Sequence, residues 1–134
     1  MHGAASLMTR SLRVLVVEDE ALVADYVADI IEDAGHTVAG VAATGEKAIE
    51  LLESASIDLA VLDITLRGPM TGIDVASTAR ACGVPHLFIT GSGDPSTRAA
   101  AEETQPLGFL LKPFSGERLI EVLMAVITSG HEPL

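Results

Sequence analysis

Acidic side chains follow two apolar runs of the chain, at the point where each run stops. Residues 59–62 end on Asp63, and residues 12–17 end on Glu18 and Asp19. Each run is typical of a buried parallel strand, and open α/β sheets hold their ligands at the carboxyl ends of such strands. If the two strands are neighbours, the three carboxylates share one small volume. Such crowding is costly without a cation, so the pattern predicts a hard divalent metal ion, with Asp63 free to act as a nucleophile.

Two further apolar runs end on polar side chains that suit phosphoryl transfer. Residues 85–90 stop at Thr90, and residues 107–111 are followed by Lys112. An oxygen of Asp63 can attack phosphorus in line and form an acyl phosphate, without a general base, because carboxylates are ionised at neutral pH. Lys112 offers a cation to the transferred group, and the Thr90 hydroxyl offers a hydrogen bond. We expect Mg²⁺, which prefers oxygen ligands and retains water.

The predicted metal ligands come from both acidic strand ends. We expect the ion to be held by Asp19, by Asp63 and by the backbone carbonyl of Thr65, with Glu18 reaching it through water. Each residue also has an ordinary explanation. Acidic residues such as Asp19 often stabilise the start of a helix, and a residue such as Asp63 can cap a loop. A single Lys112 is more often a solvated lysine, so only the whole set favours a site.

The composition is that of one acidic domain. The chain has 134 residues, of which 49% are hydrophobic but only 3% aromatic, and this favours the Ala, Val, Leu and Ile core of a helix-covered parallel sheet. Its net charge of −11 argues against unaided binding of nucleic acid and against anionic membranes. The lone Cys82 excludes an internal disulfide, and no run resembles a signal peptide or a membrane span. We therefore expect a cytoplasmic protein.

Strands and helices are predicted to alternate along residues 11–129, between a flexible leader at 1–10 and a short tail at 130–134. The predicted strands are 12–17, 36–42, 57–62, 85–90 and 107–111. The predicted helices are 19–34, one capped by Thr44, 73–81, 95–104 with Asp94 as its cap, and 115–128. Five such pairs predict an α/β, flavodoxin-like, doubly wound parallel sheet in the order 2-1-3-4-5, with five helices.

Apolar residues recur at helical spacing in the first and last predicted helices, and we expect all of them to face the core. In the first helix they are Leu22, Val23, Tyr26, Val27, Ile30 and Ile31. In the last helix they are Leu119, Ile120, Leu123, Met124, Val126 and Ile127.

The acidic pair after the first strand, Asp63, Thr90 and the triplet Lys112-Pro113-Phe114 together resemble the receiver domain of two-component response regulators, over about residues 12–128. The resemblance implies a signalling phosphoacceptor, not an enzyme that turns over a separate substrate. It implies that a sensor histidine kinase is the phosphoryl donor, that a downstream protein reads the signal, and that the Lys112-Pro113 peptide is cis. It also implies that Phe109 is the aromatic switch residue, which turns inward when Thr90 is drawn toward the phosphorylated Asp63.

Two segments depart from the common receiver pattern. Pro69 lies later in the loop after Asp63 than the family's usual proline, and Gly91 stands where Ala is common. Residues 88–91 are similar to the Phe-Ala-Thr-Gly motif of a subgroup of stand-alone alphaproteobacterial receivers, which often serve general-stress pathways. Gly91 and Gly93 predict an unusually mobile loop.

Three functions remain open from the sequence. The first is a stand-alone receiver that signals by protein contact or serves as a phosphate shuttle or sink, or else a receiver cut from a longer regulator. The second is a phosphatase of the haloacid dehalogenase type, although such enzymes normally place a second Asp two residues after the nucleophile, where Thr65 stands. The third is a receiver-like interaction module that is never phosphorylated.

Overall fold

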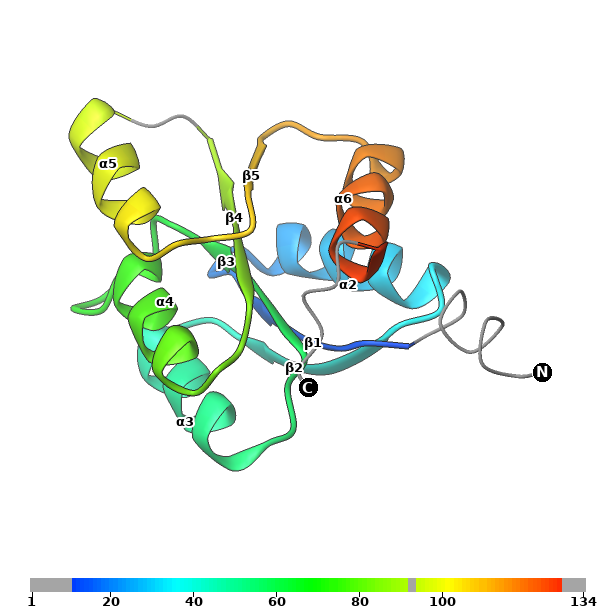
Figure 1. Cartoon of the computed structure of the whole chain (residues 1–134), viewed down its shortest axis with the longest axis horizontal. Helices are drawn as coiled ribbons and strands as arrows, with labels where there is room; N and C mark the ends of the chain where they lie inside the picture. The colour runs from blue at the N-terminus through cyan, green and yellow to red at the C-terminus, as the bar shows by residue number, and fades with distance from the viewer. Residues whose placement is uncertain (1–10, 92–93, 129–134) are drawn as a thin grey trace.

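The computed structural model describes residues 11–91 and 94–128. Within these residues, five parallel strands alternate with five helices (Figure 1). The strands are β1 (Arg13–Val17), β2 (Thr37–Ala42), β3 (Leu59–Asp63), β4 (His86–Thr90) and β5 (Phe109–Leu111). The helices are α2 (Ala21–Asp33), α3 (Gly45–Ser54), α4 (Gly72–Ala81), α5 (Pro95–Glu103) and α6 (Gly116–Thr128).

The sheet has the order β2-β1-β3-β4-β5, and every neighbouring pair is parallel. This confirms the predicted flavodoxin-like fold and its strand order. Because β1 and β3 are neighbours whose outer partners lie on opposite sides, the connection direction reverses between them. The carboxyl ends of these two strands are therefore the switch point at which such sheets bind ligands.

The helices form a layer on each face of the sheet. One layer consists of α2 and α6, and the other of α3, α4 and α5 (Figure 1). Alternate residues of each strand point to opposite layers: in β1, Leu15 and Val17 contact the second layer, whereas Val14 and Val16 contact the first. Both faces of the central strands are thus buried, which explains why these strands are continuously apolar in the sequence.

The helix starts follow the expected capping chemistry. Thr44 accepts a hydrogen bond from the amide of Lys47, and Asp94 accepts one from the amide of Thr97, with Pro95 at the first helical position. Both predicted caps are confirmed. A third start, at α4, has a reciprocal capping box between Thr71 and a residue three positions on. This cap fixes the end of the loop that follows β3.

Two predicted apolar faces were wrong in part. On α2, Leu22 is 84% exposed and Tyr26 is also exposed, while Val27, Ile30 and Ile31 are buried. The helix packs against β1, β2 and α6, and these contacts leave Leu22 in solvent, whereas the partly exposed Tyr26 ring lies 5.8 Å from that of Phe114.

On α6, Ile120 and Met124 are exposed, whereas Leu119, Leu123 and Ile127 face the core. Helical spacing marks an apolar arc that is wider than the strip which a single sheet face can cover. Element ends also moved by small amounts: α2 begins at Ala21 instead of residue 19, and β5 begins at Phe109 instead of residue 107.

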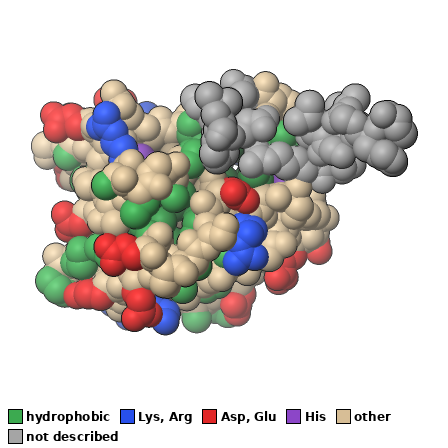
Figure 2. Space-filling model, turned by 60° about the horizontal axis from the view of Figure 1, so that its bottom comes forward, with side chains coloured by type: hydrophobic (Ala, Val, Ile, Leu, Met, Phe, Trp, Pro, Cys, Tyr) green, Lys and Arg blue, Asp and Glu red, His purple; other side chains and the backbone are tan. Residues whose placement is uncertain are grey.

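Three predictions lie outside the described residues: the leader at 1–10, the tail at 130–134 and the part of the mobile loop at 92–93. Within the part of the chain that the structure describes, each helix is too short or too polar to cross a membrane. On the face seen in Figure 2, acidic side chains are spread over the surface and the Lys and Arg side chains lie apart from one another. The excess of acidic over basic side chains on this face agrees with the net charge of −11.

Candidate functional site

The pairing of β1 with β3 brings the predicted acidic residues together. Val17 lies opposite Leu62, so the next residues, Glu18 and Asp63, leave the sheet side by side. Glu18, Asp19 and Asp63 each offer a carboxylate oxygen, and these three oxygens lie within 4.8 Å of one another. Glu18 and Asp63 are buried, at 4% and 6% exposure, while Asp19 is half-buried. The sequence prediction that these three carboxylates meet is confirmed by this geometry.

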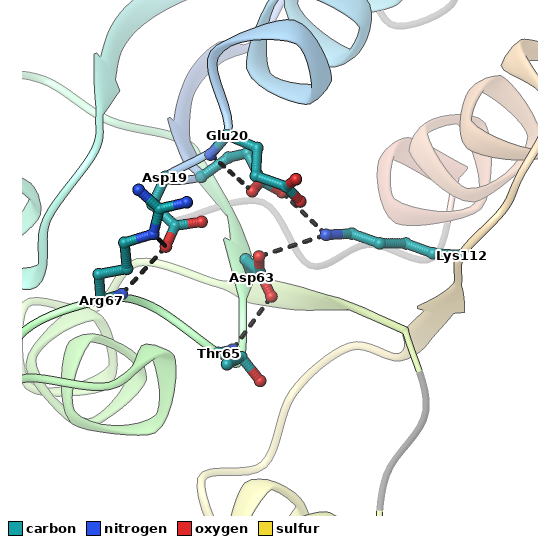
Figure 3. Close-up of polar contacts among 7 residues, drawn as sticks. Asp19, Glu20, Asp63, Thr65, Arg67 and Lys112 are labelled. Carbon is teal, nitrogen blue, oxygen red and sulfur yellow. Dashed lines mark hydrogen bonds and ion pairs between the residues drawn. The ribbon is translucent and has the colours of Figure 1, made fainter.

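Lys112 reaches across from β5 and pairs with two of the carboxylates. Its Nζ lies 3.1 Å from Oε1 of Glu18. The same Nζ lies 3.2 Å from Oδ2 of Asp63 (Figure 3). Its backbone is tied to β4, because its amide donates to the carbonyl of Thr90 at 2.8 Å. The peptide bond from Lys112 to Pro113 is cis, as expected. Side chains from the ends of β1, β3 and β5 therefore meet in one place, and the β4 end is joined to them through the backbone of Thr90.

Burial and charge act against each other in this pair of contacts. Burial raises the pKa of Glu18 above its ordinary value, although hydrogen bonds from the Glu20 amide and from Lys112 oppose the shift. Burial also disfavours the charge on Lys112, but the bonds and charges of Glu18 and Asp63 outweigh it, and the pKa of Lys112 lies above its usual value. The lysine is thus held in its charged form by the acids that it neutralises.

The loop after β3 closes around the second oxygen of Asp63. The amide of Thr65 donates to Oδ1 of Asp63 at 3.0 Å, so the two carboxylate oxygens have different partners. Gly72 packs so tightly against this loop that a Cβ there would overlap the carbonyl oxygen of Asp63. The carboxylate is therefore held by a backbone which only glycine allows to pack this closely. That the Thr65 carbonyl is a metal ligand stays a prediction.

One contact in the site was missed by the sequence reasoning. The amide of Arg67 donates to Oδ2 of Asp19 at 3.1 Å, and its guanidinium Nε lies 3.5 Å from the same oxygen (Figure 3). An exposed arginine in a loop carries no periodic signal that would single it out. Arg67, Asp19, Asp63 and Lys112 line an open hollow of about 540 Å³.

Thr90 ends β4, and Phe109 begins β5, three residues before Lys112. Thr90 is buried at the end of β4, one residue beyond Ile89, which pairs with Asp63. Phe109 pairs with Phe88 and is half-buried, and the two rings stack at 5.6 Å between centroids. The guanidinium of Arg98, from α5, lies 3.7 Å from the centre of the Phe109 ring. The aromatic residue is thus held between one aromatic ring and one cation.

The donor set suits a hard cation. It consists of carboxylate oxygens, it is crowded, and Lys112 is paired with only two of its three acids. Oxygen ligands and a partly open pocket are what Mg²⁺ prefers, because this ion keeps several of its waters. The residues present therefore fit a magnesium ion.

Comparison with known proteins identifies the fold family. The model of the response regulator receiver domain matches residues 14–124. The chain belongs to this family. Receiver domains of this kind are signalling phosphoacceptors of two-component systems that bind Mg²⁺ at an acidic pocket and work with histidine kinases and downstream effectors. This chain has an acidic cluster of Glu18, Asp19 and Asp63 at the ends of β1 and β3.

Other receivers have similar sequences and structures. The chain is 33% identical to the chemotaxis protein CheY of Thermotoga maritima, over 85% of this chain and 96% of that protein. The receiver domain of a modulated diguanylate cyclase from Desulfovibrio desulfuricans G20 superimposes with a TM-score of 0.84 at 33% identity, covering 89% of this chain and 95% of that one.

Several relatives are longer than this receiver. It is 30% identical to the transcriptional regulatory protein PdtaR of Mycobacterium tuberculosis, over 90% of this chain but 58% of that protein. It is 32% identical to TcrA of the same species, over 98% of this chain and 52% of that protein. The chain thus spans little more than half the length of these curated relatives.

Proposed function

We propose that Asp63 accepts a phosphoryl group from a phosphohistidine of a sensor histidine kinase. One observation carries the proposal: the carboxylate of Asp63 lies at the switch point of the sheet, within reach of two acidic neighbours and in contact with Lys112. Because Thr65 and Lys112 each bind a different oxygen, the orientation of the carboxylate is fixed before a donor arrives. Such pre-orientation lowers the entropic cost of an in-line attack.

The proposed transfer moves one phosphoryl group without net oxidation or reduction. An oxygen of Asp63 forms a bond to phosphorus while the bond from phosphorus to the histidine nitrogen breaks, and that nitrogen keeps the electron pair and takes up a proton. Lys112 then shifts part of its interaction from the free carboxylate to the oxygens of the transferred group. Glu18 remains bonded to Lys112 and keeps the amine in place.

Asp19, Asp63 and the backbone carbonyl of Thr65 would hold Mg²⁺, with Glu18 reaching it through water, and the bound ion would neutralise charge on the phosphoryl oxygens. Hydrolysis of the acyl phosphate returns Asp63 to its free form, so the protein carries a signal with a limited lifetime. We expect Thr65 to influence this lifetime because it lines the hollow beside Asp63.

We propose that Thr90 and Phe109 pass the change to the surface. The Thr90 hydroxyl would donate a hydrogen bond to the new phosphoryl group, which draws the Thr90 side chain toward Asp63. Phe109 would move into the space that the Thr90 side chain leaves. Phe has no hydroxyl group, so its preference depends on packing against Phe88 and on the cation of Arg98. The surface formed by α5, β5 and α6 would then present a different shape to a downstream protein.

We propose that the receiver works alone in the cytoplasm, either by protein contact or as a shuttle or sink for phosphate. The motif of residues 88–91 supports a place in the alphaproteobacterial Phe-Ala-Thr-Gly subgroup. The alternative is a receiver within a longer regulator, and the greater length of PdtaR and TcrA supports this alternative. The measurement that separates these two is the length of the chain found in cells by immunoblotting.

A phosphatase of the haloacid dehalogenase type is the less favoured candidate. Its second carboxylate would stand two residues after the nucleophile, where the structure has Thr65, and the Thr65 amide contacts Asp63. Hydrolysis of phosphate esters by the purified protein, lost in Asp63→Asn, would revive this candidate.

Phosphorylation by a small donor tests the proposed function. We expect the purified protein to gain the mass of one phosphoryl group when incubated with Mg²⁺ and acetyl phosphate, and Asp63→Asn to gain none. Omission of Mg²⁺ should abolish the gain. An unchanged mass in the native protein would support an interaction module that is never phosphorylated. Profiling phosphotransfer from the histidine kinases of the same genome would then identify the donor.

A further inference from the structure

Arg67 makes two contacts with a single oxygen of the acidic pocket. Its backbone amide and its guanidinium Nε both approach Oδ2 of Asp19, at 3.1 Å and 3.5 Å (Figure 3). The carboxylate is 12% exposed, whereas the arginine side chain is 83% exposed. The guanidinium therefore lies over the acid from the solvent side, at the rim of the hollow that contains Asp63.

The loop after β3 places Arg67 there. Leu66 is buried against the core, and Gly68 has a φ of +97°, which lets the chain turn directly after the arginine. At the end of the loop, the amide of Gly72 donates to the carbonyl of Ile64 at 2.9 Å. The backbone of Arg67 is thus fixed on both sides, and its side chain starts from a point that already contacts Asp19.

The charges of the pocket are divided between two cations. Lys112 contacts Glu18 and Asp63, and Arg67 contacts Asp19. Each of the three carboxylates that could hold a metal ion therefore has a side-chain cation as a partner. The two pairs differ in exposure: Lys112 is largely covered, while the Arg67 side chain can leave toward water without losing burial.

We propose that Arg67 is the resident counter-cation of Asp19 and competes with Mg²⁺ for this carboxylate, so that it sets the metal affinity of the receiver. The inference rests on the proposed function in that it takes Mg²⁺ as the ion. When the ion binds, the guanidinium swings away from Asp19, while the backbone amide keeps its hydrogen bond and holds the carboxylate in place. Arg67 is a positioning residue in this scheme and takes no part in the bonds that form or break.

The expected effect follows from Coulomb's law. A unit charge and a divalent ion in neighbouring positions at a protein surface repel each other enough to change an equilibrium by up to about tenfold at low ionic strength. Salt reduces the interaction of such an exposed charge. We therefore expect Arg67→Ala to bind Mg²⁺ about three- to tenfold more tightly than the native protein, and we expect the difference to shrink as salt is added.

Isothermal titration of the unphosphorylated full chain with MgCl₂ tests the proposal. Arg67→Lys keeps the charge and should bind Mg²⁺ almost as weakly as the native protein. Arg118→Ala is the matched control, because it removes the same charge from an exposed arginine that pairs with Glu121 on α6, away from the acidic pocket. Its affinity should stay near the native value. Circular dichroism of each variant shows that it is folded.

The outcomes separate this inference from the proposed function. If Arg67→Ala binds Mg²⁺ no more tightly than Arg118→Ala, the competition is refuted, while phosphorylation of Asp63 by acetyl phosphate can still stand. If Arg67→Ala loses affinity, Arg67 assists binding and the proposal is also refuted. If neither the native protein nor Arg67→Ala binds Mg²⁺, the competition and the magnesium dependence of the proposed function both fail.

Discussion

Replacing Lys112 by Met tests how the pocket tolerates its buried acids. The substitution keeps the length of the side chain and removes the charge that lies 3.1 Å from Glu18 and 3.2 Å from Asp63. Removing one partner of a buried ion pair costs about 3–5 kcal/mol, because the remaining charge is left without compensation. The hollow above Asp63 is open to water on one side, so we expect a smaller loss of about 2–3 kcal/mol in the free energy of unfolding.

Magnesium should restore part of the stability that Lys112→Met loses. A divalent ion bound by Glu18, Asp19 and Asp63 compensates the same carboxylates, and any ligand that binds only the folded state raises its stability. The loss measured in saturating Mg²⁺ should therefore be clearly smaller than the loss measured in a chelator.

The assay is urea unfolding at neutral pH, followed by far-ultraviolet circular dichroism, in a chelator and in Mg²⁺. Lys47→Met is the matched control: its Nζ lies 2.8 Å from Glu50, but both side chains are more than half exposed. Such a surface pair contributes less than about 1 kcal/mol. Equal losses in the two lysine variants, or a Lys112→Met loss that Mg²⁺ leaves unchanged, would refute the idea that Lys112 compensates buried acids.

Three further changes test other parts of the molecule. Gly72→Ala should destabilise the protein by about 2 kcal/mol or more in urea unfolding, because the added Cβ would overlap the Asp63 carbonyl. Gly108→Ala is the control and should change little, since a Cβ there meets open space. Equal losses in the two variants would contradict the steric argument. Burial, with help from Arg80, lowers the pKa of His86 to about 4, so its neutral form is favoured in the folded state and stability falls as pH drops from about 6.5 to 4. His86→Leu should flatten the plot of unfolding free energy against pH in this range. An unchanged plot would contradict the view that His86 causes the loss of stability. Arg98→Ala removes a cation–π contact with the Phe109 ring of about 0.5–1 kcal/mol, so the ring should leave its present position more often. Aromatic NMR line shapes can report this motion. Unchanged line shapes would contradict the idea that Arg98 holds the ring.

Much of the site could be predicted because its residues stand at strand ends. Asp63 and Lys112 each follow an apolar run, and the alternation of strands and helices fixes which edge of the sheet those runs share. Local sequence also determines the caps, since Thr44 and Asp94 need only the amides three residues on. These features depend on spacing within a few residues or on a well-known topology.

The exposed apolar residues and two of the side-chain contacts could not be predicted, because they depend on which elements lie beside them in the folded chain. Leu22 and Met124 fit a helical apolar pattern, but the pattern does not say how far the opposing surface extends. Arg67 contacts Asp19 only because the loop after β3 comes close to the residues that follow β1. The position of Arg98 over Phe109 likewise depends on how α5 packs beside β5. None of these contacts follows from residue spacing.

The most direct test of the central claim is to locate the phosphoryl group chemically. The protein is phosphorylated with acetyl phosphate and Mg²⁺, reduced with borohydride, which converts an aspartyl phosphate to homoserine, and mapped by tandem mass spectrometry. We expect homoserine at position 63 alone, and none after treatment without the phosphoryl donor. Homoserine at position 19, or a stable phosphoryl group on another residue with position 63 unchanged, would contradict the claim that Asp63 is the acceptor.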